Sequence, residues 1–348
     1  EGVLARRGRP QVALGPNPAR ATVAVVVLTL NQLWATLLTY DGAVAREEMV
    51  RLPTLTLDRD ALVGAVVEAI ERLTAGGPAP QSIALAVQGI TDAEGTRMLW
   101  SPITPHADIA FGPLLAARFD VPVTVQNDCN MIAVALKWRW PQRYRDDFFA
   151  ILLSDGIGMG LMQKGKLFTG THSSGGEFGH MIHKPHGALC RCGRHGCIEA
   201  YAGNYAVMRM ASGGSENDPP AADISEAEME ALADAARAED GPERAAFRKA
   251  GEAIGYGLGS LFALFDPAPV AIVGPGAVAF DIMEGPIREA IAQTAGGQHS
   301  GAISFATETD EMPLIREGCA MTALDYVDAQ IAAPGRAAVL QQNGREVA

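Results

Sequence analysis

Apolar and polar positions follow strand and helix periodicities through the first third of the chain. Two apolar runs precede the turn Asp41-Gly42 and predict a β-hairpin. The helical spacing of Leu62, Val66 and Ile70 predicts the first helix. The full series is strand, strand, strand, helix, strand, helix, strand and helix, at 22–28, 34–40, 45–52, 58–74, 83–87, 112–119, 121–125 and from about Asn127 onward. This order is typical of an α/β protein.

A second unit repeats the opening of the first. It begins with a strand, a Gly-rich turn and another strand, and a Gly- and Cys-rich stretch follows at 170–197. The predicted elements are strands at 148–153, 158–163 and 270–273, and helices near 198–210, 226–238, 243–265, 278–293 and 312–332. Because each unit starts with a hairpin and ends as α/β, the pattern predicts a duplicated architecture.

The charge of the chain is concentrated in one segment. A length of 348 residues allows about two domains, and the formal net charge of −12 excludes a protein coated in basic charge. Residues 216–243 hold ten Asp and Glu against the single Arg237, so little of the negative charge lies elsewhere. This acidic insert, 213–243, is expected to form a surface helix or lid, and a docking site for a partner protein is the alternative.

Hydropathy and cysteine usage indicate the compartment. The most apolar run, Ala21–Leu30, is too short to span a bilayer, and no signal peptide is recognisable, so no membrane association is expected. Three of the five cysteines crowd between 190 and 197, which is unlike a disulfide framework. We therefore expect a protein of the reducing cytoplasm with a metal site.

The cysteine cluster is the most informative segment, and its loop spans 175–199. Cys190, Cys192 and Cys197 are interleaved with glycines that let the backbone turn, so the three thiols can converge on one tetrahedral Zn²⁺. A loop of free thiols is the alternative. A structural zinc ion is expected, because four protein ligands leave no position for water. The spacing leaves four candidates for the fourth ligand: His180, His183, His186 and His195.

The segment Gly176-Glu-Phe-Gly-His180, followed by Cys190-x-Cys-Gly-x-x-Gly-Cys197-x-Glu199, resembles the zinc signature of the ROK family of repressors, open reading frames and sugar kinases. Further matches lie at 121–128, 155–160, 164–165 and 265–276. The resemblance implies two actin-like (ribonuclease H-like) α/β lobes with a central cleft, and His180 as the fourth zinc ligand. It implies an N-terminal lobe of 21–128 plus 312–334, a C-terminal lobe of 129–311, and a tail at 335–348.

The same resemblance implies a sugar site. The family positions that hydrogen-bond sugar hydroxyls correspond to Glu177, His180 and Glu199, and those of the cleft floor to Asn127 and Asp128. In a kinase, Asp128 would be the general base. A helix N-cap is the alternative role for Asn127, and loop salt bridges are the alternative for the two glutamates. The sequence 103–105 (Ile-Thr-Pro) replaces a family Asn, which is a departure from a standard hexose site.

The phosphate loops depart from the kinase pattern. Family kinases carry Asp-x-Gly-Gly-Thr-Lys in the first hairpin, where glycines admit ATP phosphates and the Asp helps to hold Mg²⁺. This chain has Val27-Leu-Thr-Leu-Asn-Gln32 there, and Ser154-Asp155-Gly156 replaces a second Gly-Thr-Gly loop. We therefore predict no kinase activity, and an ATP-dependent, glucokinase-like sugar kinase with a degenerate phosphate loop is the alternative.

The first twenty residues predict a regulator. This stretch is expected to be a linker behind a missing winged helix–turn–helix, and Arg7, Gly8 and Arg9 resemble a minor-groove hook. A solvated linker is the alternative. The sequence thus predicts the effector-binding and oligomerisation body of a ROK-type repressor, a homodimer or homotetramer. Its expected partners are DNA and a small sugar or sugar-phosphate effector.

Overall fold

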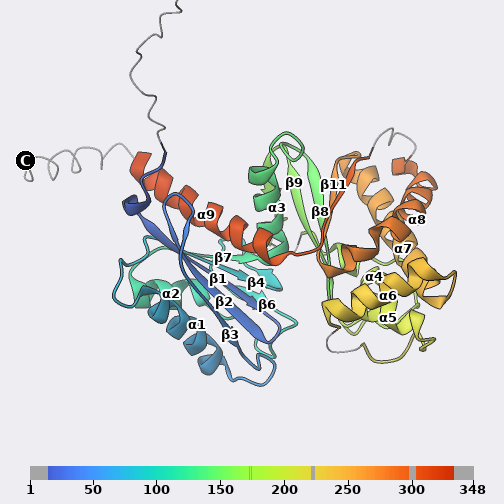
Figure 1. The fold of residues 1–348 in the computed structure, drawn as a ribbon, viewed down its shortest axis with the longest axis horizontal. Helices are drawn as coiled ribbons and strands as arrows, with labels where there is room; N and C mark the ends of the chain where they lie inside the picture. The colour runs from blue at the N-terminus through green and yellow to red at the C-terminus, as the bar shows by residue number, and fades with distance from the viewer. Residues whose placement is uncertain (1–14, 172, 174, 221–223, 298–302, 333–348) are drawn as a thin grey trace, which may run out of the picture.

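The computed structural model describes residues 15–171, 173, 175–220, 224–297 and 303–332. Within these ranges the chain folds into two five-stranded sheets with helices on both sides of each (Figure 1). The predicted minor-groove hook, Arg7, Gly8 and Arg9, and the tail at 335–348 lie outside the described residues.

The first sheet has the strand order β3-β2-β1-β4-β7. Its strands are β1 (Thr22–Thr29), β2 (Gln32–Thr39), β3 (Val44–Arg51), β4 (Ile83–Val87) and β7 (Val123–Asn127). The first three strands pair antiparallel, and β4 and β7 then extend the sheet in parallel from β1. A small two-stranded sheet of β5 (Ile90–Thr91) and β6 (Met98–Trp100) follows β4.

The second sheet repeats this plan with the order β10-β9-β8-β11-β12. Its strands are β8 (Phe148–Leu153), β9 (Ile157–Gln163), β10 (Lys166–Phe168), β11 (Val270–Val273) and β12 (Phe305–Glu308). Again three antiparallel strands are followed by two parallel ones. The predicted duplication of a hairpin followed by α/β units is confirmed at the level of sheet topology.

The helices divide among the faces of the two sheets (Figure 1). They are α1 (Arg59–Thr74), α2 (Phe111–Phe119), α3 (Asp128–Arg139), α4 (Glu199–Ala202), α5 (Asn204–Ala211), α6 (Glu226–Ala238), α7 (Pro242–Phe265), α8 (Phe280–Ala292) and α9 (Met312–Ala332). Helices α1 and α2 cover one face of the first sheet, and α4 to α8 cover one face of the second. Among the described helices, none is both long and apolar enough to cross a membrane.

Strand β8 and the stretch between the two terminal threonines of β1 are apolar throughout because both faces of each sheet are buried. Val23, Val25 and Val27 point to a core shared with α3, α9 and β8, whereas Val26 faces the α1 and α2 side. Helix α3 can approach β9 closely because Gly160 has no side chain: a Cβ there would lie 2.2 Å from the Cys129 carbonyl oxygen. The pair α3 and α9 therefore forms the packed layer between the two sheets (Figure 1).

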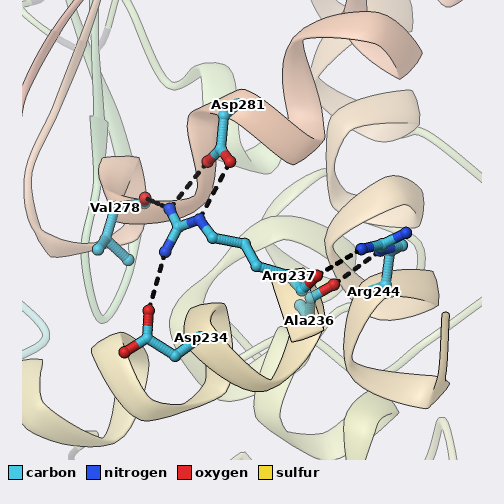
Figure 2. A network of polar contacts seen from close by, with 6 residues as sticks. All are labelled: Asp234, Ala236, Arg237, Arg244, Val278 and Asp281. Atoms are coloured by element: carbon cyan, nitrogen blue, oxygen red, sulfur yellow. Dashed lines mark hydrogen bonds and ion pairs between the residues drawn. The ribbon is translucent and has the colours of Figure 1, made fainter. Parts of the chain in front are cut away.

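The acidic insert ends in α6, whose buried face packs on α7. Figure 2 shows how its last turn is fixed: the Arg237 guanidinium donates to both carboxylate oxygens of Asp281 in α8, at 3.0 and 2.9 Å, and to the Val278 carbonyl oxygen at 2.6 Å. Arg244 of α7 donates to the carbonyl oxygens of Ala236 and Arg237. The prediction of a surface helix is confirmed for 226–238, and α6 is anchored at its C-terminal end.

Some elements differ from the sequence prediction. The single helix expected at 198–210 is two helices, because the chain leaves helical geometry at Gly203, whose φ and ψ of −65° and 152° are those of an extended residue. The helix expected at 278–293 begins as a 3-10 helix at Pro275–Ala279 before α8. The short strands β5, β6, β10 and β12 were not predicted, since two to four residues are too few to show a period.

Candidate functional site

A deep cleft of about 1170 Å³ opens between the two sheets. The turn between β1 and β2, β6 and the beginning of α3 form one side, and the turn between β8 and β9, the cysteine loop and the beginning of α6 form the other. The segment that leads into α9 lines the cleft as well. All five residues predicted to bind a sugar line this cleft: Asn127, Asp128, Glu177, His180 and Glu199.

His180, Cys190, Cys192 and Cys197 form a compact cluster in which the potential ligand atoms all lie within 4.8 Å of one another. Cys192 Sγ and Cys197 Sγ are 3.8 Å apart, and Cys190 Sγ lies 3.8 Å from His180 Nδ1. A tetrahedral ion with Zn–S bonds of about 2.3 Å requires sulfur–sulfur distances of about 3.8 Å. The donor set and its spacing therefore fit a four-coordinate metal ion, as the sequence predicted for these four residues.

The backbone of the cysteine loop depends on glycine at one position above all. Gly196 has φ +88°, and a Cβ there would lie 1.9 Å from the Lys184 carbonyl oxygen. Its N–H donates to the Ala188 carbonyl oxygen, and its own carbonyl accepts from the N–H groups of His183 and Lys184. This doubling back of the chain brings Cys197 beside Cys190, which lies on the opposite strand of the loop.

The other three candidate histidines lie outside the cluster. The His183 ring packs against Tyr201 and Tyr256, with ring centroids 5.0 and 5.9 Å apart. His195 Nδ1 lies 3.0 Å from the Gly187 carbonyl oxygen, and His186 occupies a loop position with φ +59°. Only His180, at the end of the 3-10 helix Phe178–His180, belongs to the cluster among the described histidines. Its Nε2 faces the Glu177 carboxylate in the cleft at 3.8 Å.

Glu199 connects the cysteine loop to the second hairpin. Its carboxylate is buried, Oε1 lies 3.4 Å from both Cys190 Sγ and Tyr205 Oη, and Oε2 accepts a 3.2 Å hydrogen bond from Ile157 N–H. These contacts are with a thiol, a phenol and a backbone N–H, so Glu199 supports the cysteine loop without forming the loop salt bridge that was its alternative role. Its place in the cleft wall leaves acceptor capacity for a ligand, because a carboxylate can accept about four hydrogen bonds.

Asn127 and Asp128 form the cleft floor where β7 passes into α3. Asn127 is the N-cap of α3: its Oδ1 accepts from Asn130 N–H at 3.1 Å, and its Nδ2 donates to the Gly89 carbonyl oxygen. The N-cap alternative for Asn127 is therefore confirmed. Asp128 is 5% exposed and its Oδ1 accepts from Cys129 N–H. Burial raises the pKa of Asp128 to about 6, and the negative charge of Glu177 adds to that effect.

The first hairpin turn is tight. Thr29 and Gln32 are paired, so only Leu30 and Asn31 form the turn, and Asn31 has φ +59°. The Asn31 N–H donates to Thr54 Oγ1 at 3.2 Å, which leaves it unavailable to an anion. Gln32 accepts a hydrogen bond from Trp34 Nε1. The turn therefore presents Thr, Leu and Gln side chains to the cleft, where a glycine-lined phosphate loop would present open backbone.

The second hairpin turn adds negative charge to the cleft. Leu153 pairs with Ile157, and Asp155 lies in the three-residue turn between them. Among the described residues that line the cleft, seven are Asp or Glu and two are Arg. Burial raises the pKa of Glu311, in the segment before α9, to about 7, and the charges of Asp310, Glu226 and Asp128 contribute.

Several residues of the cleft were missed by the sequence reasoning. They include Trp34, Trp100, Glu226, Asp310, Glu311 and Arg316. The sequence could have indicated Glu226, because it lies in the acidic insert that was expected to form a surface helix or lid. The sequence offered no signal for Glu311, since it lies in the short link between β12 and α9 and is 157 residues from Ser154, whose Oγ lies 3.5 Å from Glu311 Oε1 in the folded chain.

Comparison with known proteins agrees with this geometry. The profile of the ROK family matches residues 30–315, which is most of the chain. The chain belongs to the ROK family. It is 28% identical to a glucokinase of Thermotoga maritima over 73% of this chain and 82% of the glucokinase. It is 24% identical to a xylose repressor of Caldicellulosiruptor bescii over 82% of this chain and 74% of the repressor.

Solved structures give the same fold. A ROK family transcriptional regulator, a homologue of the Escherichia coli MLC protein, superposes with a TM-score of 0.76 at 24% identity. The alignment covers 91% of this chain and 82% of the regulator. The α/β actin-like fold that the sequence resemblance implied is therefore confirmed. Because the family relatives include sugar kinases and repressors, the choice between these activities depends on the cleft itself.

Proposed function

We propose that this ROK protein is the sugar-sensing body of a transcriptional regulator and that it does not phosphorylate sugars. The observation that supports the proposal most directly is the turn between β1 and β2. A phosphate loop needs backbone N–H groups turned toward the anion and small residues that let it approach. Here the turn consists of Leu30 and Asn31, and the Asn31 N–H is already bonded to Thr54 Oγ1.

The composition of the cleft supports the same proposal. ATP would bring several negative charges, and phosphoryl transfer requires cations that neutralise them. Asp155 occupies the second hairpin turn, and Glu226 and Glu311 lie near it in the cleft wall. These three carboxylates would repel the phosphates of ATP.

The metal proposed for the cysteine cluster is zinc, in a structural role. Three thiols and one imidazole are a common ligand set for tetrahedral zinc, and four protein ligands leave no open position for a catalytic water. His180 would use Nδ1 toward the metal and keep Nε2 toward the cleft, near Glu177. A bound ion would thus orient a side chain that also faces the effector.

The effector would bind in the cleft between the sheets, against Asn127, Asp128, Glu177, His180 and Glu199. The lobes proposed to move are 21–128 with 312–334, and 129–311. The xylose repressor relative supports DNA as a partner. We propose that the protein contacts DNA through a helix–turn–helix domain, with Arg7, Gly8 and Arg9 beside that domain. We also propose that the protein resides in the cytoplasm and assembles into a homodimer or homotetramer.

A sugar kinase is the second candidate, and Asp128 favours it. A general base works best when its pKa lies near the operating pH, and burial raises the pKa of Asp128 to about 6. In a kinase this carboxylate would take the proton of the attacked hydroxyl. In the regulator the same buried carboxylate accepts hydrogen bonds from the effector.

The experiment that separates the two candidates is a coupled ADP-release assay with MgATP and a panel of hexoses and amino sugars. We expect no turnover above background, with the Thermotoga maritima glucokinase as positive control. The variant Asp128→Asn serves as the internal control, since turnover that survives it comes from a contaminant. Sugar-dependent turnover that Asp128→Asn abolishes would overturn the proposed function and establish the kinase.

A further inference from the structure

The charge of the cleft bears on which effector it accepts. Seven carboxylates and two arginines line it among the described residues. Both arginines are engaged within the protein: Arg316 pairs with Glu47 and lies over the Trp34 ring at 5.8 Å, and Arg191 lies over the Tyr205 ring at 4.9 Å. The cleft therefore offers an anionic ligand much less cationic than carboxylate surface.

Helix N-termini are the other usual anion sites, because their first N–H groups lack partners within the helix. Of the helices that begin at this cleft, the longer ones α3, α6 and α9 already have a side-chain cap, whereas the four-residue α4 has none. Asn127 Oδ1 accepts from Asn130 N–H in α3, Ser225 Oγ accepts from Glu228 N–H in α6, and Asp310 Oδ1 accepts from Met312 N–H before α9. In α6 the cap is reciprocal, since Glu228 also accepts from Ser225 N–H. A phosphate group would have to displace these caps.

Asp128 is a second, independent indication, because it is a buried carboxylate without a cationic partner. It is 5% exposed, it lines the cleft, and its Oδ1 accepts a 2.9 Å hydrogen bond from the N–H of the adjacent Cys129. No Lys, Arg or His among the described residues forms an ion pair with it. The charged neighbours that act on it are carboxylates: the charge of Glu177 raises the pKa of Asp128, and the charge of Asp128 in turn raises the pKa of Glu311. A buried, unpaired carboxylate is costly unless a bound group satisfies it.

The side of the cleft that holds Asp128 also carries two aromatic side chains. Trp34 and Trp100 line it, and the Trp100 side chain is 44% exposed. Indole faces bind the apolar faces of sugar rings and also attract cations. Aromatic rings and a buried carboxylate in one cleft suit a ligand that combines a sugar ring with a positive charge.

We infer that the effector is an amine-bearing saccharide without a phosphate group, bound with its ammonium group against Asp128 and Glu311. The inference rests on the proposed sugar-binding function and narrows it. The sequence predicted either a sugar or a sugar phosphate as the effector. The negative charge of the cleft favours a positively charged sugar over both. A phosphorylated sugar would place its dianion among carboxylates and beside helix ends that are already capped.

Four probes that differ in one group test the inference by calorimetry at neutral pH: D-glucosamine, D-glucose, N-acetyl-D-glucosamine and D-glucosamine 6-phosphate. We expect glucosamine to bind about tenfold more tightly than glucose, the order of one partly buried charge-assisted hydrogen bond. The acetylated probe, in which the amine carries no charge, and the phosphorylated probe should both bind more weakly than glucosamine.

The variants Asp128→Asn and Glu311→Gln should each reduce the preference for glucosamine over glucose, and Glu289→Gln, on the exposed face of α8 outside the cleft, should preserve it. Two separate variants guard against a folding defect in either one, and circular dichroism checks both. Equal or tighter binding of the acetylated or phosphorylated probe, or no binding of any probe, would overturn the inference. Phosphorylation of glucosamine would overturn the regulator proposal while leaving the charge preference intact, so the two failures are distinguishable.

Discussion

Glu199 Oε1 lies 3.4 Å from Cys190 Sγ, while Oε2 of the same carboxylate accepts a hydrogen bond from Ile157 N–H. One side chain thus contacts both the cysteine cluster and the hairpin turn that closes the cleft. A Cβ on Gly156 would lie 3.0 Å from Glu199 Oε2, so the turn rests directly on this carboxylate. Glu199 thus joins the cluster to the cleft wall, which the cluster members His180 and Cys192 also line directly.

Removal of one thiol should affect both sites. Cys192→Ser replaces a thiolate ligand by a hydroxyl, which binds zinc poorly. Changes to residues that only orient metal ligands cost about 10–100-fold in affinity, so loss of a ligand should cost more. We expect zinc content, measured by mass spectrometry of the metal, to fall together with the calorimetric affinity for D-glucosamine. His180→Ala should behave alike, and His186→Ala, whose side chain lies outside the cluster, is the matched control. Unchanged sugar affinity in a zinc-free Cys192→Ser protein would show that the two sites are not coupled.

Two glycines of the cysteine loop form a matched pair. Gly196→Ala would place a Cβ 1.9 Å from the Lys184 carbonyl oxygen, whereas at Gly193 nothing lies within 4 Å of an added Cβ. Both have positive φ, so each alanine carries a backbone cost of about 1–2 kcal/mol. We expect Gly193→Ala to lose about that much unfolding free energy and to retain its metal. Gly196→Ala should lose more and release metal, because the loop has to rearrange. Equal losses in urea denaturation would mean that the close approach at Gly196 is relieved without cost.

Much of the fold was predictable because its main signals are local. The valines of β1 are buried on both faces of a sheet, and such strands show as continuous apolar runs. The break at Gly203 was missed because the apolar spacing continues from α4 into α5 on both sides of it. Strand β12 was missed because four residues, paired in parallel with β11, have no hairpin turn to mark them.

The candidate site likewise has one part that local sequence predicted and another part that it did not. The three thiols lie within a segment of eight residues, so they could be grouped from spacing. Spacing left four histidines open, the family resemblance implied His180, and the folded loop brings His180 to the thiols. Glu311 could not be placed, because it reaches Ser154 only through a path of more than a hundred residues. The sequence analysis named four of the seven carboxylates in the cleft and missed Glu226, Asp310 and Glu311, so it did not show how acidic the cleft is.

Asp128 should make stability depend on pH in a definite direction. Burial raises its pKa from 3.8 in the unfolded chain to about 6. Between these values the folded protein holds a proton that the unfolded chain has lost, so the free energy of unfolding contributed by Asp128 falls as pH rises from about 4 to about 6. Above that window the ionised carboxylate costs about 1–3 kcal/mol. Asp128→Asn should therefore be the more stable protein at pH 8 and should gain little at pH 4. Urea titrations at both pH values, with Glu289→Gln as control, measure this, and an identical pH response of Asp128→Asn and the unaltered chain would refute the raised pKa.

The anchor of α6 should control how firmly that helix covers the cleft. Arg237 joins α6 to α8 through Asp281 and donates directly to the Val278 carbonyl oxygen, and Asp234 adds a 3.2 Å contact within α6 (Figure 2). Arg237→Met keeps the apolar stem and removes these donors, at a cost of about 1 kcal/mol because the group is partly exposed and screened by solvent. We expect faster hydrogen exchange across α6 and weaker binding of D-glucosamine, since Glu226 at the other end of the helix lines the cleft. Arg72→Met, which removes a similar pair with Glu48 near α1, should leave exchange in α6 unchanged. If Arg237→Met accelerates exchange but preserves glucosamine affinity, α6 covers the cleft without contributing to the site.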